Sequence, residues 1–308
     1  GGYGVGAFNV NNMEQIQGIM KAARELNSPV ILQASRGALK YTDMVYLKYL
    51  VQAAVEQNPD IPVVLHLDHG DSLETVKKAI ELGFTSVMID ASHHDFETNV
   101  RISREVVEYA HQFGVSVEAE LGTLGGIEED VAGEVQLTDP DQAEEFVERV
   151  GCDALAVAIG TSHGAYKFRG EPKLALDLIS EIYSRVKIPL VMHGSSSVPK
   201  ELVETINTYG GSIQDSYGVP IESIQHGIKN GVRKINVDTD LRLAMTGAVR
   251  KTLFEDPSKF DPRDYLGPAR EAVYQVVAQR MKDFGSAGHG GDYEPMTLED
   301  MKEIYGVK

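Results

Sequence analysis

Three apolar segments of the chain each lead into a histidine that is followed by glycine. They read IPVVLHLDHG over residues 61–70, ALAVAIGTSHG over residues 154–164 and PLVMHG over residues 189–194. At the end of a buried strand a neutral imidazole can bind a metal ion, and the glycine lets the backbone turn sharply beside an anion. One such histidine would more often be an ordinary polar residue, but three in the same position predict that His69, His163 and His193 hold one divalent ion.

The other histidines lack that placement and are expected to be structural or exposed. His226 fits a helix surface and His289 a flexible tail. The remaining four are His66, His93, His94 and His111. Glu120, in VEAELG, is a candidate fourth or alternate metal ligand. Three imidazoles suit zinc, although cobalt(II) or iron(II) would also fit.

Asp68 lies next to the first of these histidines and could move a proton to or from a substrate oxygen. Neighbours in a strand point to opposite faces, so Asp68 and His69 can share a pocket only if the strand has already ended at His69. Gly70 makes such a bend plausible. The alternative is that Asp68 only orients a histidine.

Composition limits the partners of this site. The 308 residues include 46 acidic and 29 basic side chains, which gives a formal charge of −17. Such a field repels nucleic acid and anionic membranes, so neither is expected as a partner, and a phosphate site would need local positive groups. Cys152 is the only cysteine, which excludes an internal disulfide and fits the reducing cytoplasm. No apolar run approaches the ~18 residues of a membrane span.

The elements that position these residues alternate between strands and helices along the whole chain. Most strand candidates are continuous apolar runs, typical of a parallel sheet covered by helices on both faces. Eight units favour a single closed (β/α)8 TIM barrel over residues 1–308, with a tail helix within residues 285–308. The predicted strands are Val5–Val10, Pro29–Ala34, Pro62–Leu67, Ser86–Asp90, Val115–Leu121, Ala154–Ile159, Pro189–Met192 and Lys234–Val237.

Polar residues fall at or just past the carboxyl ends of these strands. In a barrel those ends share one rim, so the side chains would meet in one pocket, whereas an open sheet would scatter them along an edge. Helix start signals occur at Asn11, Asp71 and Asp139, and Gly151 is expected to end the helix that Asp139 opens.

Glycine and small hydroxyl residues follow the last strands, where this fold often binds phosphate through backbone N–H groups. Gly164, Gly194, Ser196 and Thr239 fit that role, and Lys167 could add a positive charge.

Residues 122–140, GTLGGIEEDVAGEVQLTDP, form a long, acidic and glycine-hinged segment. This pattern predicts a mobile lid over the site. Glu128 within it is a candidate for a second proton-transfer group, the alternative being one of several solvated loop acids.

The motifs LHLDHG, TSVMIDAS, VSVEAELG, GTSHGAYK, VMHGSSS and INVDTD together resemble the class II, metal-dependent fructose-1,6-bisphosphate aldolases. The resemblance covers essentially the whole chain in the same motif order. It implies a zinc-dependent (β/α)8 barrel, usually dimeric or tetrameric. It also implies reversible cleavage of fructose 1,6-bisphosphate into dihydroxyacetone phosphate and glyceraldehyde 3-phosphate. Two departures are a missing helix before the first strand and a lid segment shorter than in many members.

By position, the resemblance makes His69, His163 and His193 the zinc ligands, with Glu120 contacting the ion in some states. Asp68 becomes the acid/base at the C4 hydroxyl, with zinc stabilising the enediolate that forms when the C3–C4 bond breaks. Glu128 becomes the base that exchanges a proton with the dihydroxyacetone phosphate carbon.

The resemblance also assigns the groups around the substrate. Asn236 would position the ketose, Ser35 a substrate oxygen, and Arg263 in FDPRDYLG would reach a neighbouring subunit's site in a homodimer or homotetramer. One phosphate, often with a sodium or potassium ion, would be surrounded by Gly164, Lys167, Gly194, Ser196, Asp238 and Thr239.

Four alternatives stay open at this point. The sugar could be tagatose 1,6-bisphosphate or sedoheptulose 1,7-bisphosphate. A zinc hydrolase on the same fold would need a His-x-His pair on the first strand, where Ala7-Phe8-Asn9 stands. A Schiff-base aldolase would need a lysine near a strand's carboxyl end, whereas Lys234 is at a strand start and Lys167 in a loop. The last is an inactive barrel used for binding.

Overall fold

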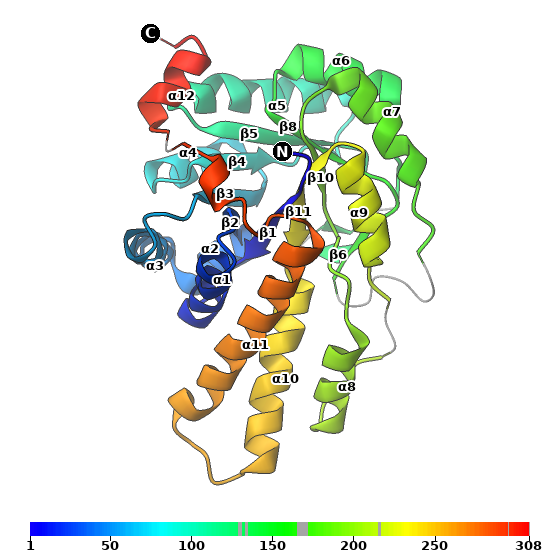
Figure 1. Cartoon of the computed structure of the whole chain (residues 1–308). Helices are drawn as coiled ribbons and strands as arrows, with labels where there is room; N and C mark the ends of the chain where they lie inside the picture. Colours follow the sequence, from blue (N-terminus) through cyan, green and yellow to red (C-terminus); the bar gives the residue numbers. More distant parts are fainter. Residues whose placement is uncertain (129–130, 133–134, 165–171, 215–216, 295, 308) are drawn as a thin grey trace.

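The computed structural model describes residues 1–128, 131–132, 135–164, 172–214, 217–294 and 296–307 of the 308-residue chain. Within this described part, the main sheet is a closed barrel of parallel strands in the order β1-β11-β10-β8-β5-β4-β3-β2 (Figure 1). The predicted TIM-barrel fold is therefore confirmed. The strands are β1 (Val5–Asn9), β2 (Val30–Ser35), β3 (Val63–Gly70), β4 (Ser86–Ile89), β5 (Ser116–Leu121), β8 (Ala154–Val157), β10 (Leu190–Met192) and β11 (Val232–Val237).

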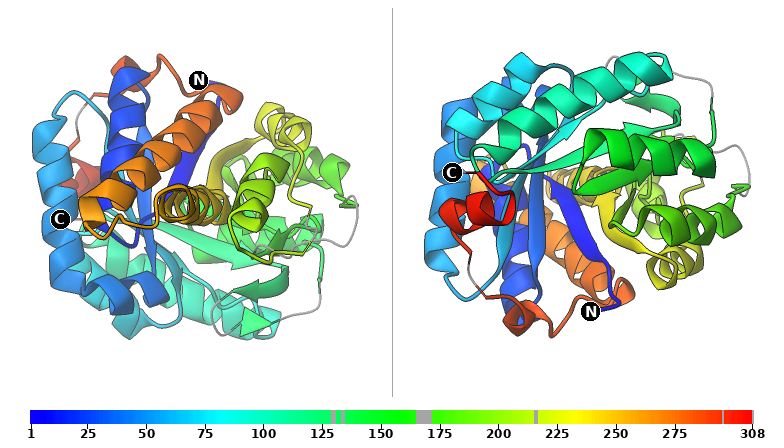
Figure 2. Two further views of the ribbon diagram at one scale, coloured as in Figure 1. Left: turned by 90° about the horizontal axis from the view of Figure 1, so that it is seen from below. Right: turned by 90° about the horizontal axis from the view of Figure 1, so that it is seen from above.

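Helices surround the barrel, as both end views show (Figure 2). They bury apolar side chains against the strands, so the principal core is a ring between the two layers that includes Phe8, Leu32 and Phe146. The helices are α1 (Met13–Glu25), α2 (Arg36–Thr42), α3 (Met44–Gln57), α4 (Leu73–Glu81), α5 (Phe96–His111), α6 (Pro140–Val150), α7 (Leu176–Val186), α8 (Lys200–Thr208), α9 (Ile221–Lys229), α10 (Thr239–Glu255), α11 (Pro262–Asp283) and α12 (Leu298–Ile304), with a 3₁₀ turn η1 (Gly290–Asp292).

Two of the predicted helix starts are off by one residue. The N-cap of α1 is Asn12 rather than Asn11, and the N-cap of α4 is Ser72 rather than Asp71. Each neighbouring pair holds two residues that can cap, and the one whose side chain accepts the N–H three residues later takes the role. Asp139 caps α6 as predicted, and Gly151 ends that helix in the left-handed conformation, with φ 73°.

Residues 122–140, the predicted lid, contribute to a small second sheet. Strand β6 (Gly125–Glu128) pairs with β7 (Val131–Ala132) and, in parallel, with β9 (Ser162–His163). The segment is thereby hydrogen-bonded to the backbone of the second predicted metal ligand, His163.

Two helices extend away from the barrel. α10 begins directly after β11 and runs outward, and α11 returns to pack on α10 and α1 (Figure 1). No helix in the described ranges combines the length and apolarity that a membrane crossing requires.

The C-terminal helix α12 lies at the opposite end of the barrel from the tips of α10 and α11 (Figure 1). The ring of Tyr305 stacks on His111 at the end of α5, with centroids 3.6 Å apart and planes 3° from parallel. Nε2 of His111 lies 2.9 Å from Oδ2 of Asp153, and Val117 N–H donates to the same oxygen. The predicted tail helix is therefore present, and these contacts hold it against the end of the barrel where the strands begin.

His289, expected in a flexible tail, also has fixed contacts. It stacks on Tyr3, with ring centroids 4.1 Å apart, and its Nδ1 lies 2.7 Å from Asp292. His226 lies half-buried in the last turn of α9, close to the helix-surface position predicted for it.

Candidate active site

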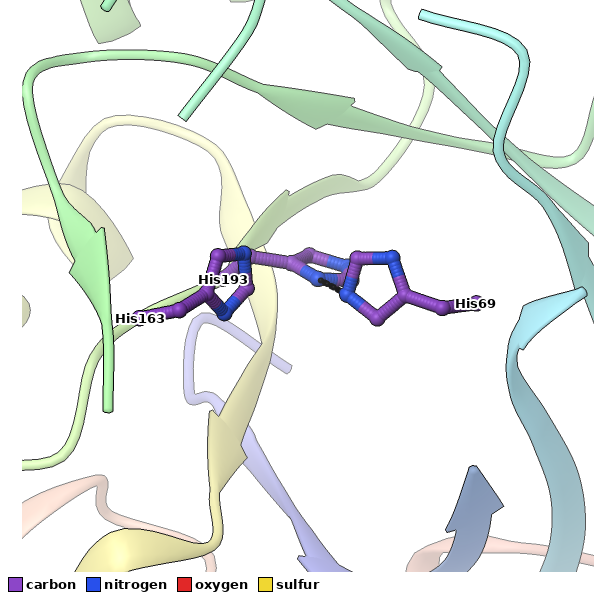
Figure 3. Close-up of side chains that lie close together, drawn as sticks. All are labelled: His69, His163 and His193. Carbon is purple, nitrogen blue, oxygen red and sulfur yellow. Dashed lines mark hydrogen bonds between the residues drawn. The ribbon is translucent and has the colours of Figure 1, made fainter. Parts of the chain in front are cut away.

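The three predicted metal ligands converge. One ring nitrogen from each of His69, His163 and His193 lies within 4.8 Å of the others, and the rings are turned toward one another (Figure 3). His69 belongs to β3, His163 to β9, and His193 follows β10 directly. The ring centroids of His69 and His193 are 4.7 Å apart, and those of His69 and His163 are 5.2 Å apart. Three segments far apart in the sequence therefore form one cluster.

Strand β3 brings both Asp68 and His69 to the cluster, although not by ending at His69 as predicted. The strand continues to Gly70, and its pairing with β4 slips between Leu67 and Gly70. His69 takes a left-handed conformation, with φ 49°. This β-bulge interrupts the alternation of side chains along β3, so the neighbouring side chains of Asp68 and His69 point to the same side of the strand. Gly70 is required there because a β-carbon would lie 2.4 Å from the carbonyl oxygen of Met88.

Two of the imidazoles have a carboxylate on one ring nitrogen. Nδ1 of His69 lies 3.0 Å from Asp90, and Nε2 of His193 lies 2.7 Å from Glu118. Burial raises the pKa of Asp90, but the hydrogen bonds that it accepts from His69 and Ser92 outweigh it, so this pKa falls well below its usual range. An ionised carboxylate accepts the proton of the nitrogen that it faces, and this fixes the tautomer of each ring.

The other two nitrogens then carry lone pairs toward each other. Nε2 of His69 and Nδ1 of His193 are 3.0 Å apart. Burial lowers the pKa of His193, although the hydrogen bond that its Nε2 donates to Glu118 raises it, so the ring is neutral. Two neutral acceptors at this distance favour a shared cation, and neutral imidazole is the form that binds metal. Donor type, tautomer and spacing fit a divalent metal ion.

A second group of possible ligands shares His69 with Asp90 and Glu120. Glu120 is buried and lies on β5 beside Ala156 of β8, on the inner side of the barrel. Its predicted role as a fourth or alternate ligand is compatible with this position.

Below the cluster the barrel interior holds a polar network that the sequence reading missed. Glu118 accepts from Nζ of Lys234 at 2.9 Å, besides its contact with His193. Burial would raise the pKa of Glu118, but the charge of Lys234 and the bond with His193 lower it well below its usual range. Burial, and next the charge of Lys234, lower the pKa of His66 to about 3. Glu118 is therefore ionised and His66 neutral.

The sequence feature that could have indicated this network is the two-residue period with which side chains face the same side of a strand. Glu118 precedes Glu120 by two residues, and Lys234 precedes Asn236 by two, so each pair faces the same side. Lys234 donates to Oδ1 of Asn236 at 2.8 Å, which links the network to the rim.

Asp68 is buried and held by amide groups from neighbouring strands. Its Oδ2 accepts from Asn9 at 3.0 Å and from Gln33 at 3.3 Å, and its Oδ1 accepts from Asn236 at 3.4 Å. Oδ1 also lies 3.9 Å from Nε2 of His69. These contacts aim the carboxylate at the cluster, where it can exchange a proton with a bound molecule. Gln33 was not predicted as part of the site.

The predicted phosphate residues line one pocket beside the histidines. Gly194 has φ 60°, and a β-carbon there would lie 2.6 Å from the carbonyl oxygen of Ser162. Ser196 Oγ accepts from the backbone N–H of Asp238 at 3.3 Å. The pocket lining comprises Asn9, Gln33, Asp68, His163, Gly164, Gly194, Ser195, Ser196, Asn236, Asp238 and Thr239.

Among the residues predicted to contact substrate, Ser35 and Arg263 are not part of this lining. Ser35 caps α2 by accepting from Ala38 N–H at 3.2 Å. Arg263 is 89% exposed at the start of α11 and pairs with Asp261. Lys167 lies outside the described residues, and Glu128 is described only as the last backbone position of β6.

Comparisons with known proteins agree with this geometry. A sequence profile described as class-II fructose-bisphosphate aldolase matches residues 1–289. A fructose-bisphosphate aldolase of Giardia intestinalis is 67% identical over 305 residues, which cover 98% of this chain and 94% of the relative. One from Thermus caldophilus is 56% identical and covers 93% of this chain and 94% of the relative.

Solved structures carry the same fold. The YdjI aldolase of Escherichia coli K12 superposes with a TM-score of 0.76 at 33% identity and covers 94% of each chain. A structure titled as a putative fructose-1,6-biphosphate aldolase from Coccidioides immitis gives a TM-score of 0.75 at 29% identity, covering 95% of this chain and 94% of that one. With a convergent histidine cluster on a closed barrel and these matches along nearly its whole length, the chain belongs to the class II fructose-bisphosphate aldolase family, and hence to the aldehyde-lyases.

Proposed function

We propose that this chain cleaves fructose 1,6-bisphosphate reversibly into dihydroxyacetone phosphate and glyceraldehyde 3-phosphate at the histidine cluster. One observation carries the proposal. His69, His163 and His193 meet beside the buried carboxylate of Asp68, at the mouth of a pocket lined by glycine and serine. A cation site, a proton carrier and an anion pocket are the three parts that aldol cleavage of a phosphorylated ketose needs.

His69, His163 and His193 would hold a divalent ion, with Glu120 as an additional or alternate ligand. Zinc suits three imidazoles best, and cobalt(II) or iron(II) would also be accepted. When bound there, such an ion would act as a Lewis acid, supplying positive charge at the C2 carbonyl and for the enediolate charge that develops during cleavage. Asp90 and Glu118 orient two of the rings.

Asp68 takes the proton of the C4 hydroxyl as the C3–C4 bond breaks, and returns it in the condensation direction. Its amide partners Asn9, Gln33 and Asn236 hold the carboxylate in place beside the cluster. Glu128 is proposed as the base that exchanges the proton at the dihydroxyacetone phosphate carbon.

The pocket beside His163 would take one phosphate. Asn236 would position the ketose and Ser35 a substrate oxygen. The phosphate would contact Gly164, Lys167, Gly194, Ser196, Asp238 and Thr239, with a sodium or potassium ion offsetting charge in this acidic protein.

We also propose that residues 1–308 form one catalytic domain with a tail over residues 285–308, and that the protein works in the cytoplasm as a homodimer or homotetramer. The position of Arg263 supports the proposed oligomeric state. This residue is exposed in the first turn of α11. The α10–α11 pair projects away from the barrel (Figure 1), so we expect Arg263 to reach the site of a neighbouring subunit and supply charge for the far phosphate.

A cleavage assay tests the proposal directly. The protein is assayed on fructose 1,6-bisphosphate, tagatose 1,6-bisphosphate and sedoheptulose 1,7-bisphosphate, before and after chelation and with zinc restored. Fastest cleavage of the fructose sugar, lost on chelation and recovered with zinc, is expected. Faster cleavage of another sugar would change the substrate assignment, and chelator-resistant activity trapped by borohydride would reject the metal mechanism.

A further inference from the structure

The loop of residues 194–199 between β10 and α8 has an unusual backbone. Its first residues, Gly194 to Ser196, line the pocket proposed for phosphate. Val198, two residues further on, has φ 47°. This left-handed conformation is unfavourable and rare for a β-branched residue, so neighbouring groups must hold it in place.

The side chain of Asp240 provides that support. One carboxylate oxygen accepts from the backbone N–H of Val198 at 2.8 Å, and the other accepts from that of Ser197 at 3.1 Å. Asp240 lies in the first turn of α10 and is fully buried. A single carboxylate therefore ties the strained part of the loop to the helix that begins at Thr239, which lines the other side of the same pocket.

A buried cation completes the arrangement. Nη2 and Nε of Arg280, on α11, lie 3.1 and 3.3 Å from Oδ2 of Asp240. The Arg280 side chain is 7% exposed, and its Nη1 also contacts Asp283. A buried ion pair of this kind holds the carboxylate of Asp240 in a fixed position against the N–H groups of the loop.

Neither member of this pair touches the pocket. Asp240 and Arg280 are absent from its lining, whereas the loop that they hold provides Gly194, Ser195 and Ser196. Any effect of the pair on substrate must therefore pass through the loop backbone or through the start of α10 at Thr239.

We propose that Asp240 and Arg280 form a positioning pair that holds residues 194–198 in the conformation that binds the substrate's phosphate. This inference rests on the proposed function, since it takes the pocket to be the phosphate site. It predicts that breaking the pair weakens phosphate binding while the histidine cluster keeps its metal and its chemistry.

The main test uses Asp240→Asn in the zinc-loaded protein. The amide places an NH₂ against one of the two N–H groups, so the loop should relax. We expect KM for fructose 1,6-bisphosphate and the inhibition constant of inorganic phosphate both to rise about tenfold, the loss of roughly one good hydrogen bond to the anion. We expect kcat to stay within about threefold and the zinc content to stay unchanged.

Asp283→Asn is the matched control because it removes the other partner of Arg280 and leaves the loop contacts intact. It should change neither constant. If Asp240→Asn does not fold, Arg280→Lys replaces it. This variant keeps the carboxylate of Asp240 but gives it a shorter cationic partner, so we expect a smaller rise in KM and in the inhibition constant of phosphate.

A rescue variant separates positioning from general stability. Glycine adopts φ near 47° without strain, so Val198→Gly in the Asp240→Asn background should recover most of the lost phosphate affinity. The same change removes apolar contacts with Val203 and Ile206 and should lower the melting temperature further. Recovered affinity at lower stability would support positioning, whereas affinity that falls together with stability would reject it.

Two further results would overturn the inference. One is a folded Asp240→Asn protein with unchanged KM and unchanged phosphate inhibition. The other is a loss confined to kcat or to zinc content. If the wild-type protein binds phosphate but cleaves no sugar bisphosphate, the proposed function fails, and direct titration with inorganic phosphate still tests the pair.

Discussion

The two ends of the barrel both carry histidine–carboxylate pairs, but they use them differently. At the carboxyl end, His69 contacts Asp90 and His193 contacts Glu118, and the second nitrogen of each ring faces the other ring at 3.0 Å. At the amino end, His111 contacts Asp153, and its ring face is covered by Tyr305. A histidine–carboxylate pair is thus no sign of a metal centre by itself, and convergence of several rings is the distinguishing feature.

Left-handed non-glycine residues occur at both ends but in different places. At the amino end Asn27 and Lys187 lie where α1 and α7 end, before the next strand begins. At the carboxyl end the positive φ values include those of His69, Gly194 and Val198, all in or next to the proposed site. Unfavourable conformations of this kind persist where the surrounding structure holds them, and they gather at functional sites. The amino end instead uses a short helix stacked against α5, which adds stability without bringing reactive groups together.

The largest contrast is expected from removing one histidine at each end. His163→Ala deletes a ligand, so zinc should fall from about one ion per chain to near zero and cleavage should drop at least about 10⁴-fold. His111→Ala should leave the zinc content and the cleavage rate unchanged. Metal analysis and initial rates measure this, and a His163→Ala protein that still binds zinc and cleaves substrate would end the comparison.

Asp68→Ala should separate the metal from the proton transfer. The imidazoles are untouched, so zinc should remain, while turnover should fall about 10³-fold without the acid/base. Zinc stoichiometry and kcat are measured on the same sample. Turnover close to wild type would show that Asp68 is not the proton carrier.

Glu118→Gln should weaken the metal without abolishing catalysis. An amide can still accept from His193, but it no longer balances Lys234, so zinc affinity should fall roughly 10–100-fold. Competition with a coloured chelator measures the affinity. Asp153→Asn is the control at the amino end and should leave it unchanged, and equal effects of the two variants would argue against a special role for Glu118.

Tyr305→Ala should give the smallest effect, and only on stability. Losing the stacked ring should cost about 1 kcal/mol, or about 2 °C in melting temperature for a chain of this size. A thermal melt and a cleavage assay test this together. A clear loss of activity would mean that the tail acts on the site and is not only a fastening.

Much of this arrangement could be predicted from the sequence. The apolar runs predict all eight barrel strands, with boundaries that differ from the structure by at most three residues, because buried parallel strands need continuous apolar residues. The three histidines that converge are recognisable because His-Gly follows such a run each time.

The rest depends on contacts that only the closed barrel creates. Glu118 and Lys234 look like isolated charges until β5 and β11 enclose the same interior and bring them 2.9 Å apart. The bulge at His69 depends on Gly70 packing against the carbonyl of Met88 from the next strand.

The loop after His193 shows the same limit. HGSSS predicts a turn, but Val198 is supported by Asp240 on α10, which is 42 positions away, and Asp240 by Arg280 on α11, which is another 40 positions away. The HGSSS motif itself does not indicate that Asp240 and Arg280 support this loop.

Anomalous diffraction at the zinc edge from crystals of the zinc-loaded protein tests the central claim most directly. We expect one strong peak about 2.0–2.1 Å from Nε2 of His69, Nδ1 of His193 and a ring nitrogen of His163. A zinc-dependent, active protein whose peak lies away from these three rings would contradict the account.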